Sequence, residues 1–213
     1  VYPNGEEPVL KNISFKCKKG EMIAFIGSTG SGKSTLINLI PRFYDVTEGS
    51  IKVDGVDVRD YDLKALKKKI GFIPQKTLLF TGSISSNIKF GKKNAKTGEV
   101  VHSAKVAQAY AFISNKPKKF EEIISEGGKN VSGGQKQRLS IARALVRKPE
   151  IYIFDDSFSA LDFKTDSILR ERLKEETKES VVLVVAQRVG SIMEADRIVV
   201  LNEGEIVGIR SEE

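Results

Sequence analysis

Short apolar runs alternate with longer stretches of helical periodicity along most of the chain. Residues 22–26, 151–154 and 181–185 are almost entirely apolar, which is typical of buried strands. A glycine-rich turn follows the first of these runs, and a helix is predicted from about Gly32 to just before Pro41. This alternation predicts an α/β fold with a largely parallel sheet.

The middle and the end of the chain show different patterns. From residue 78 to residue 145 the pattern is mainly helical, interrupted by glycine and proline. Residues 198–201 and 206–209 predict a closing hairpin around residues 202–204. We therefore expect a core formed by residues 1–77 and 146–213, with an antiparallel β portion near the N-terminus. The expected insertion at residues 78–145 is a helical subdomain.

Length and composition limit the classes of protein to which the chain can belong. Its 213 residues, 40% of them hydrophobic, suffice for one domain with a core, and its apolar runs are far shorter than the roughly 20 residues of a membrane span. The single cysteine, Cys17, excludes an internal disulfide and fits a reducing compartment. Its neighbours at positions 13–18 alternate as in a half-buried strand, so we expect a buried thiol. We assign the only histidine, His102, a solvated or packing role, and the start at Val1 suggests a piece excised from a longer protein.

The formal net charge of +7 and the isoelectric point near 9.3 raise the question of a polyanionic partner. The lysines form small clusters along the chain and lack the interleaved aromatic residues of a single-strand binding surface. We therefore interpret most of this charge as a solvated face and expect no nucleic-acid partner. A bound nucleotide or an acidic membrane surface remains compatible with the charge.

The turn after the first predicted strand has the pattern G-x-x-x-x-G-K-[ST], followed by a predicted helix. Its glycines let backbone N–H groups point at phosphate oxygens, and the helix directs the positive end of its dipole at the same place. Lys33 would reach the β- and γ-phosphates, and the Ser34 hydroxyl would bind Mg²⁺. The predicted nucleotide-binding residues are Gly27, Ser28, Thr29, Gly30, Ser31, Gly32, Lys33, Ser34 and Thr35.

A carboxylate at the end of a second buried strand completes the phosphate site. Asp155 directly follows the apolar residues 151–154. In nucleotide-hydrolysing proteins with a phosphate loop, an aspartate in this position holds Mg²⁺. Together the two motifs predict that the chain binds Mg-ATP or a close relative.

The sequence Val131-Ser132-Gly133-Gly134-Gln135 resembles the signature motif of ABC ATPases and lies about 20 residues before Asp155, where that family places it. Serine and glycines at a helix N-terminus form a second phosphate-binding surface. The resemblance implies that Ser132, Gly133, Gly134 and Gln135 contact the ATP held by the opposite subunit of a head-to-tail dimer. It also implies the fold: a P-loop NTPase (RecA-like) core, an antiparallel β portion and an inserted helical subdomain.

The same resemblance covers essentially the whole chain and assigns three further residues. Tyr2 corresponds to the aromatic residue that stacks on adenine. Gln75 corresponds to the glutamine that senses Mg²⁺ and the γ-phosphate and links the core to the helical subdomain. Asp162, in Ser159-Ala160-Leu161-Asp162, corresponds to the loop that crosses the dimer interface.

Two segments resemble exporters in which membrane and ATPase domains are fused. One is residues 79–88, after Gln75, and the other is Ser125-Glu126-Gly127-Gly128, which resembles the exporter loop that contacts the membrane domains. The implied partners are a second ABC ATPase domain and the transmembrane domains of the same transporter. The implied location is the cytoplasmic face of a cell membrane.

Two positions depart from the family pattern. A glutamate usually follows the magnesium-binding aspartate and acts as general base or orients the attacking water, but this chain has Asp156. The family also has a histidine that contacts the γ-phosphate after the third strand, where this chain has Gln187. An aspartate can still act as a base, yet both changes together resemble the degenerate half of heterodimeric ABC exporters. We predict slow hydrolysis at this site, with the intact signature motif completing a site on a different partner.

Three alternatives stay open from the sequence alone. The chain could be a separate importer ATPase subunit, or an ATP-binding switch that does not hydrolyse its nucleotide. It could also be an ABC protein acting on nucleic acid or ribosomes. Such proteins usually carry two ATPase domains or a long coiled-coil insertion, and neither is visible here.

Overall fold

The computed structural model of the chain describes residues 2, 5, 7–187, 192 and 194–211. It divides into two compact units, which we describe separately. Unit 1 contains Val1–Phe72, Glu150–Asp156 and Ser180–Glu213. Unit 2 contains Ile73–Pro149 and Ser157–Glu179.

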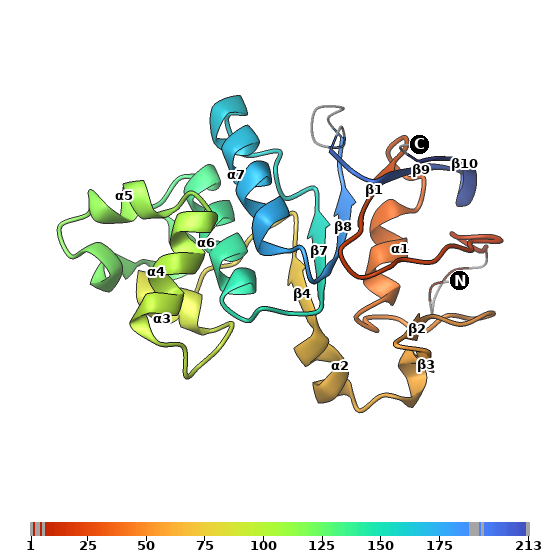
Figure 1. Ribbon diagram of the computed structural model, residues 1–213, viewed down its shortest axis with the longest axis horizontal. Coiled ribbons are helices and arrows are strands. Elements are labelled where there is room, and N and C mark those ends of the chain that lie inside the picture. Colours follow the sequence, from red (N-terminus) through yellow and green to blue (C-terminus); the bar gives the residue numbers. More distant parts are fainter. Residues whose placement is uncertain (1, 3–4, 6, 188–191, 193, 212–213) are drawn as a thin grey trace. The chain divides into compact units, whose positions relative to one another are not determined.

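Unit 1 is built on a six-stranded sheet with the order β10-β9-β1-β8-β7-β4 (Figure 1). Strand β1 runs parallel to its neighbours β8 and β9, and β7 runs parallel to β8. Strand β10 closes the sheet as an antiparallel hairpin with β9. The strands are β1 Met22–Ile26, β4 Ile70–Ile73, β7 Ile151–Asp155, β8 Val181–Val185, β9 Arg197–Asn202 and β10 Glu205–Ser211.

The remaining elements of unit 1 follow β1 and lie before β4. Helix α1 spans Lys33–Leu39, and α2 spans Leu63–Lys69. The short strands β2 (Lys52–Val53) and β3 (Val56–Asp57) pair antiparallel, and the 3₁₀ helix η1 (Val58–Asp60) follows them. This pair lies in the N-terminal part of the chain, where an antiparallel β portion is predicted.

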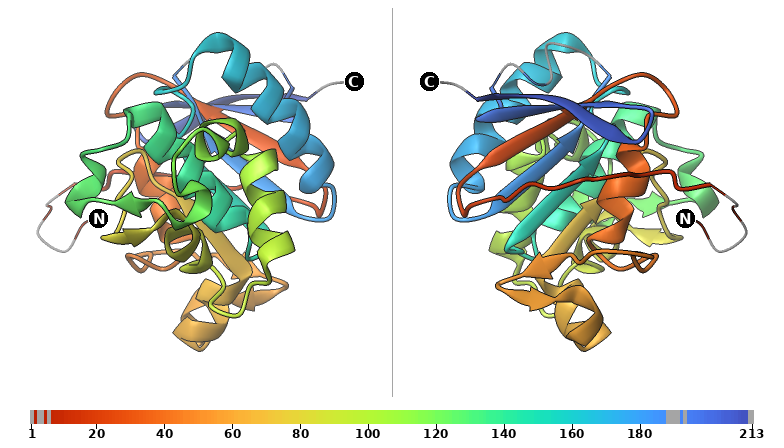
Figure 2. Two further views of the ribbon diagram at one scale, coloured as in Figure 1. Left: turned by 90° about the vertical axis from the view of Figure 1, so that its left-hand side faces the viewer. Right: turned by 90° about the vertical axis from the view of Figure 1, so that its right-hand side faces the viewer.

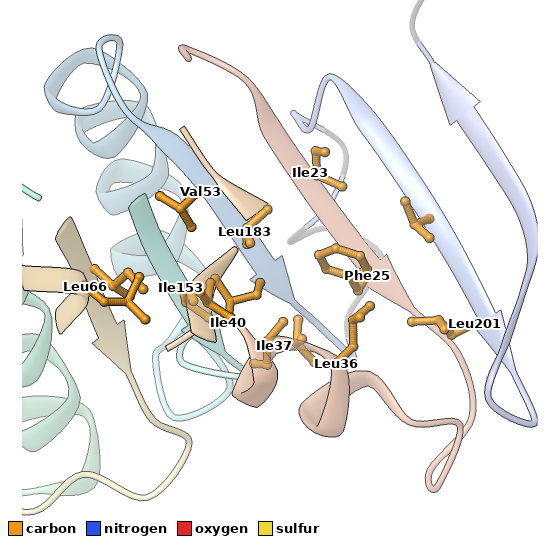
Figure 3. Packing of buried hydrophobic residues seen from close by; sticks show 14 residues of the cluster. Ile23, Phe25, Leu36, Ile37, Ile40, Val53, Leu66, Ile153, Leu183 and Leu201 are labelled. Atoms are coloured by element: carbon orange, nitrogen blue, oxygen red, sulfur yellow. The ribbon is translucent and has the colours of Figure 1, made fainter. Parts of the chain in front are cut away.

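The hydrophobic core of unit 1 lies between the sheet and α1. Ile23 and Phe25 of β1 are fully buried and belong to one cluster with Leu36 and Ile37 of α1, as Figure 3 shows. Leu201 of β9 belongs to the same cluster. Since α1 is fastened to the sheet by this core, the loop that joins β1 to α1 is held at both ends.

The structure confirms most of the predicted elements of unit 1. Strands β1 and β8 have the predicted bounds, β7 continues one residue beyond the prediction, and β9 with β10 forms the predicted hairpin (Figure 2). The strand predicted at residues 13–18 is wrong, because these residues, all of them described, form no strand. Ile13, Phe15 and Cys17 are half-buried against the core cluster while their neighbours are exposed. The alternation therefore reflects packing on one side of the segment and no strand pairing.

Unit 2 is mainly helical. Helices α3 and α4 both pack on α6, and α4 also contacts α7. His102 of α4 is largely exposed, and its Nε2 lies 2.7 Å from Oε2 of Glu176 in α7. The elements are β5 Gly82–Ser83, α3 Ile84–Lys89, α4 Thr97–Val106, α5 Tyr110–Ser114, η2 Lys119–Glu121, β6 Ile123–Ile124, η3 Glu126–Gly128, α6 Gly133–Leu145 and α7 Phe163–Glu176.

Unit 2 includes α7 in addition to the predicted helical segment at residues 78–145. That this segment is an inserted subdomain stays a prediction. Within the described part of the chain, no helix combines the length and the apolar character needed to cross a membrane.

Candidate functional site

The predicted phosphate loop connects the carboxyl end of β1 to the start of α1, within unit 1. Gly32 precedes α1 with φ of 96°, and no side chain caps the N-terminus of this helix. The first backbone N–H groups of a helix lack partners inside the helix and attract anions. The loop therefore offers donors at the place where the sequence predicts phosphates.

Gly27 shows why this loop needs glycine at its first position. A Cβ atom built on Gly27 would lie 2.1 Å from the carbonyl oxygen of Leu201 in β9, and the φ angle of Gly27 is +153°. Behind the loop, the N–H of Gly204 donates to the carbonyl of Ser31 at 3.3 Å. The β9–β10 hairpin is thus a support of the phosphate loop. The sequence analysis did not identify this role, since no local pattern near residue 204 indicates which segment the turn contacts.

Lys33 is folded back onto its own loop and is only 9% exposed. Its Nζ donates to the carbonyl oxygens of Gly27 at 2.9 Å and Ser28 at 2.7 Å, and to the Ser31 hydroxyl at 3.2 Å. Burial lowers the pKa of the ammonium group, while the nearby carboxylates of Asp156 and Asp155 act in the opposite direction. The carbonyls and the hydroxyl of the loop therefore hold the Lys33 ammonium group.

Asp155, the last residue of β7, contacts Ser34 in the first turn of α1. The Ser34 hydroxyl donates a 3.0 Å hydrogen bond to Oδ1 of Asp155. Burial raises the pKa of the Asp155 carboxyl; the hydrogen bond from Ser34 and the charge of Lys33 lower it, and the negative charge of Asp156 adds to the rise. A cation placed beside the two oxygens would relieve this unfavourable environment.

These oxygens fit Mg²⁺. Magnesium in nucleotide sites is usually bound by one or two protein oxygens, with phosphates and water completing the shell. The described residues contain no group of three or more His, Cys, Asp or Glu side chains that could hold a metal by themselves. The pair Ser34 and Asp155 is therefore suited to a metal that arrives together with a phosphate ligand.

Asp156 directly follows β7 and has an unusual backbone conformation. Its φ angle is 46°, in the left-handed region that aspartate enters more readily than most residues, and its N–H donates to the carbonyl of Val185 at 2.9 Å. The residue is 9% exposed. Its backbone is thus fixed beside the end of β8, and the length of its side chain decides where its carboxylate lies.

Gln187 is exposed and lies two residues beyond the end of β8. Strand β8 lies between β1 and β7 in the sheet, and the three strands are parallel. The carboxyl ends of the three strands therefore lie at one edge of the sheet. Strand β1 leads into the phosphate loop there, β7 ends in Asp155, and Gln187 follows β8, which lies between them. This edge is the usual ligand site of open α/β sheets.

Tyr2 contacts the helix that follows the phosphate loop. Its hydroxyl lies 2.9 Å from Oγ1 of Thr35 in α1, and its ring meets the ring of Tyr44 edge-to-face at 5.0 Å. Tyr2 is half-buried, and 43% of Tyr44 is exposed. The Tyr2 side chain therefore contacts α1 at Thr35, the residue after Ser34, and Tyr44 packs against the Tyr2 ring.

The residues assigned to the signature motif form the N-terminus of α6 in unit 2. Ser132 Oγ accepts a hydrogen bond from the N–H of Gln135 at 3.2 Å, and Gln135 Oε1 accepts one from the N–H of Ser132 at 3.1 Å. This reciprocal pair is a capping box. A Cβ atom on Gly134 would lie 3.0 Å from the carbonyl oxygen of Ala160, whereas one on Gly133 would meet no atom within 4 Å. The chain itself therefore gives no steric reason for glycine at position 133.

Two other predicted site residues lie in unit 2. Asp162 caps α7: its carboxylate accepts from the Thr165 N–H at 3.0 Å and the Thr165 hydroxyl at 2.7 Å, and these bonds lower its pKa. Gln75 is exposed and follows β4 by two residues. The structure thus brings Lys33, Ser34, Asp155 and Asp156 together in unit 1, and it describes Gln75, Asp162 and the residues 132–135 within unit 2.

Comparison with known proteins gives a consistent result. Residues 10–159 match the family model described as ABC transporter. The chain is 46% identical over 206 residues to a protein of Staphylococcus aureus (strain NCTC 8325 / PS 47) described as a multidrug export ATP-binding/permease protein. It is 47% identical to the protein of the same description from strain bovine RF122 / ET3-1. Each match covers 97% of this chain and 36% of the relative.

A solved structure shows the same fold. The structure of a bacterial Atm1-family ABC exporter with ATP bound superimposes with a TM-score of 0.92 at 35% sequence identity. The match covers 95% of this chain and 36% of that chain. The chain therefore spans about a third of the length of the proteins that it matches.

Proposed function

The chain belongs to the ABC transporter family, of which it forms an ATP-binding domain, and we propose that it binds Mg-ATP at its phosphate loop and helps to power export across a membrane. The observation that carries this proposal is the convergence of Lys33, Ser34 and Asp155 at the end of the parallel sheet. Export is favoured because the relatives are described as multidrug export proteins and the solved structure is an exporter. We place the domain on the cytoplasmic side of the membrane, in contact with transmembrane domains of the same transporter.

In this proposal each residue of the site has a defined task. The Lys33 ammonium leaves the carbonyls of Gly27 and Ser28 and turns to the β- and γ-phosphates. Ser34 and Asp155 hold Mg²⁺, which supplies positive charge to the phosphate oxygens when it is bound. The Tyr2 ring, whose hydroxyl contacts Thr35, would stack on the base. Catalysis is then mainly a matter of positioning and electrostatic stabilisation of the transferred phosphoryl group.

We further propose that this site hydrolyses ATP slowly. The backbone of Asp156 is fixed by the bond to Val185, so its carboxylate cannot move forward to replace a missing methylene group. A glutamate would reach about 1.5 Å farther toward the attacking water, and a misplacement of this size can cost about 10²-fold in rate. The amide of Gln187 can donate a hydrogen bond but cannot carry the positive charge of an imidazolium.

The signature motif supports a different role toward a partner. Ser132 and Gly134 lie at the N-terminus of α6, whose first turn contains no acidic residue. We propose that this surface completes the site of a second, different ABC ATPase domain in a head-to-tail dimer. One nucleotide would then be held stably by this chain while the other is hydrolysed on the partner.

Turnover of Mg-ATP by this chain, compared with that of a double variant Asp156→Glu, Gln187→His, tests the proposal. We expect both proteins to bind Mg-ATP with similar affinity and the double variant to hydrolyse it about 10²-fold faster. A second double variant, Asp156→Asn, Gln187→His, carries no carboxylate at position 156 and should stay slow. If the unaltered chain already hydrolyses ATP as fast as the first variant, the slow-site proposal is wrong. If it never binds ATP, the nucleotide-binding proposal is wrong too.

A further inference from the structure

Gln137 is a polar side chain buried in the helix that begins with the signature motif. It lies in the second turn of α6 and is only 3% exposed. A buried amide is costly unless it is hydrogen-bonded, so its partners define the conformation of whatever it contacts.

The partners of Gln137 are on both sides of Gln75. The Thr77 hydroxyl donates to Gln137 Oε1 at 2.6 Å. Gln137 Nε2 donates to the carbonyl oxygen of Pro74 at 3.4 Å, a longer and weaker bond. One side chain of α6 therefore holds the residue before Gln75 and the second residue after it.

Helix α6 fastens the continuation of this segment as well. Arg143 Nη1 donates to the carbonyl oxygen of Leu78 at 3.0 Å. Asn87, which accepts from Arg143 Nη2 at 3.1 Å, binds the N–H and the carbonyl of Phe80, both at 2.9 Å. The segment from Pro74 to Phe80 thus follows α6 along more than one turn, and Gln137 supplies its attachment nearest to Gln75.

The start of the segment is held by another residue of unit 2, Ser157. The buried Ser157 hydroxyl donates to the carbonyl oxygen of Ile73 at 2.8 Å. Ser157 directly follows Asp156 in the chain. The carbonyls of the two residues before Gln75 are therefore held by Ser157 and by Gln137.

We propose that Gln137 is a positioning residue for Gln75. Its amide fixes the residues on both sides of Gln75 to the helix that carries Ser132 and Gln135, and thereby sets the conformation in which Gln75 would meet the γ-phosphate. A purely structural role would require only that the amide be satisfied, and any nearby carbonyl would do. Its two partners instead bracket the one residue of the loop that is assigned to the nucleotide. The inference rests on the nucleotide site proposed above.

Discrimination between Mg-ATP and Mg-ADP tests this role, because Gln75 is assigned to the γ-phosphate, which ADP lacks. In the complete exporter, 8-azido-ATP is photo-crosslinked at 4 °C, and crosslinked peptides of this chain are quantified by mass spectrometry. Competition by unlabelled Mg-ATP or Mg-ADP then gives the affinity for each at this site. We expect Gln137→Met to weaken Mg-ATP binding about 3- to 10-fold and to leave Mg-ADP binding unchanged.

A double-mutant cycle separates positioning from general destabilisation. If Gln137 acts through Gln75, the Gln137→Met change has no further effect in a Gln75→Ala background. The measured quantity is the ratio of the affinities for Mg-ATP and Mg-ADP. The proposal is overturned if Gln137→Met leaves this ratio unchanged, or reduces it by the same factor whether residue 75 is glutamine or alanine. If Gln137→Met also abolishes Mg-ADP binding, the variant Thr77→Val replaces it in the test. This change removes only the hydroxyl that bonds Gln137, and the same two outcomes would overturn the proposal.

Thr177→Val serves as the matched control. It also removes a threonine hydroxyl that bonds a carbonyl, that of Leu173 at 2.7 Å, but at the C-cap of α7. We expect it to leave the discrimination unchanged. If the unaltered exporter binds neither nucleotide at this chain, the proposed function fails and this inference fails with it.

Discussion

Ser34 and Asp155 are 121 positions apart in the sequence, yet the hydroxyl of one donates a 3.0 Å hydrogen bond to the carboxylate of the other. The contact joins the start of α1 to the end of β7. Because Asp155 is also half-buried and lies near Asp156, its negative charge is held in an unfavourable environment. The pair is thus built for a cation and carries a cost when none is bound.

This cost leads to a prediction for Asp155→Asn. The pKa of Asp155 is raised above its ordinary value near 3.8, so the folded protein binds this proton more tightly than the unfolded chain. Stability therefore falls as pH rises through the window above 3.8, and the charged group destabilises the fold at neutral pH. Without Mg²⁺ and nucleotide, Asp155→Asn should raise the unfolding midpoint at pH 7 by roughly 1–3 °C.

The same variant should weaken Mg-ATP binding at least about tenfold. Thermal unfolding at pH 7 and pH 4, with and without Mg-ATP, measures both effects. The stability difference from the unaltered chain should shrink at pH 4. A variant less stable than the parent at pH 7 in the absence of ligand would contradict this account.

Two glycines of the phosphate loop should differ in their response to alanine. At Gly27 the new methyl group would meet the Leu201 carbonyl at 2.1 Å, whereas at Gly30, with φ of +83°, it would meet nothing within 4 Å. We expect Gly27→Ala to lower the free energy of unfolding by about 3 kcal/mol, from clash and strain together. Gly30→Ala should cost about 1 kcal/mol, from backbone strain alone. Urea denaturation measures both, and equal losses would show that the hairpin does not support the loop as described.

Ser132 can be probed so that its capping role is separated from its proposed role toward a phosphate. Ser132→Ala removes the N-cap of α6 and should cost about 1 kcal/mol of stability. Ser132→Asp keeps a capping oxygen and should leave stability nearly unchanged, but its negative charge opposes a phosphate. We expect both variants to reduce ATP hydrolysis by the complete exporter at least about tenfold. Full activity in Ser132→Asp would exclude a phosphate contact.

Cys17 should be a poorly reactive thiol in the folded protein. Burial, and then the negative charge of Glu21, raise its pKa from 9.0 to about 11, against the opposing effect of Arg197. The thiolate fraction at pH 8 is then about 100-fold lower than for an ordinary cysteine, and the thiolate is the reactive form. Alkylation by iodoacetamide at pH 8 should therefore be slow in the native protein and increase toward pH 11. The same assay in urea is the control, and equal rates in the two conditions would contradict the prediction.

The sequence predicts the strands that lead into the site because each is a short apolar run followed by a residue with a chemical signature. Residues 22–26 precede the glycine pattern, and residues 151–154 precede Asp155, so pattern and position agree. The strand prediction for residues 13–18 is wrong because one-sided burial produces the same alternation of apolar and polar residues as strand pairing. Periodicity reports which side chains are buried and does not identify the partner.

The contacts that shape the site could not be predicted in the same way. The bond from Gly204 to Ser31, the clash that excludes alanine at Gly27 and the left-handed φ of Asp156 all depend on segments that are distant in the sequence. The same is true of the bonds that Gln137 makes beside Gln75. Such contacts follow from the register and packing of the folded chain, which a single sequence does not encode in any local pattern.

The capping box at the start of α6 gives Ser132 and Gln135 a structural role in addition to the one proposed for them toward a phosphate. Their side chains close the helix end through reciprocal hydrogen bonds, whether or not a nucleotide is near. A substitution that removes the capping oxygen at either position therefore weakens the helix end, apart from any effect on the proposed phosphate contact. A screen that scores only growth would not separate the two losses, so the tolerance of these positions to mutation would report helix integrity as well as the proposed recognition of a phosphate.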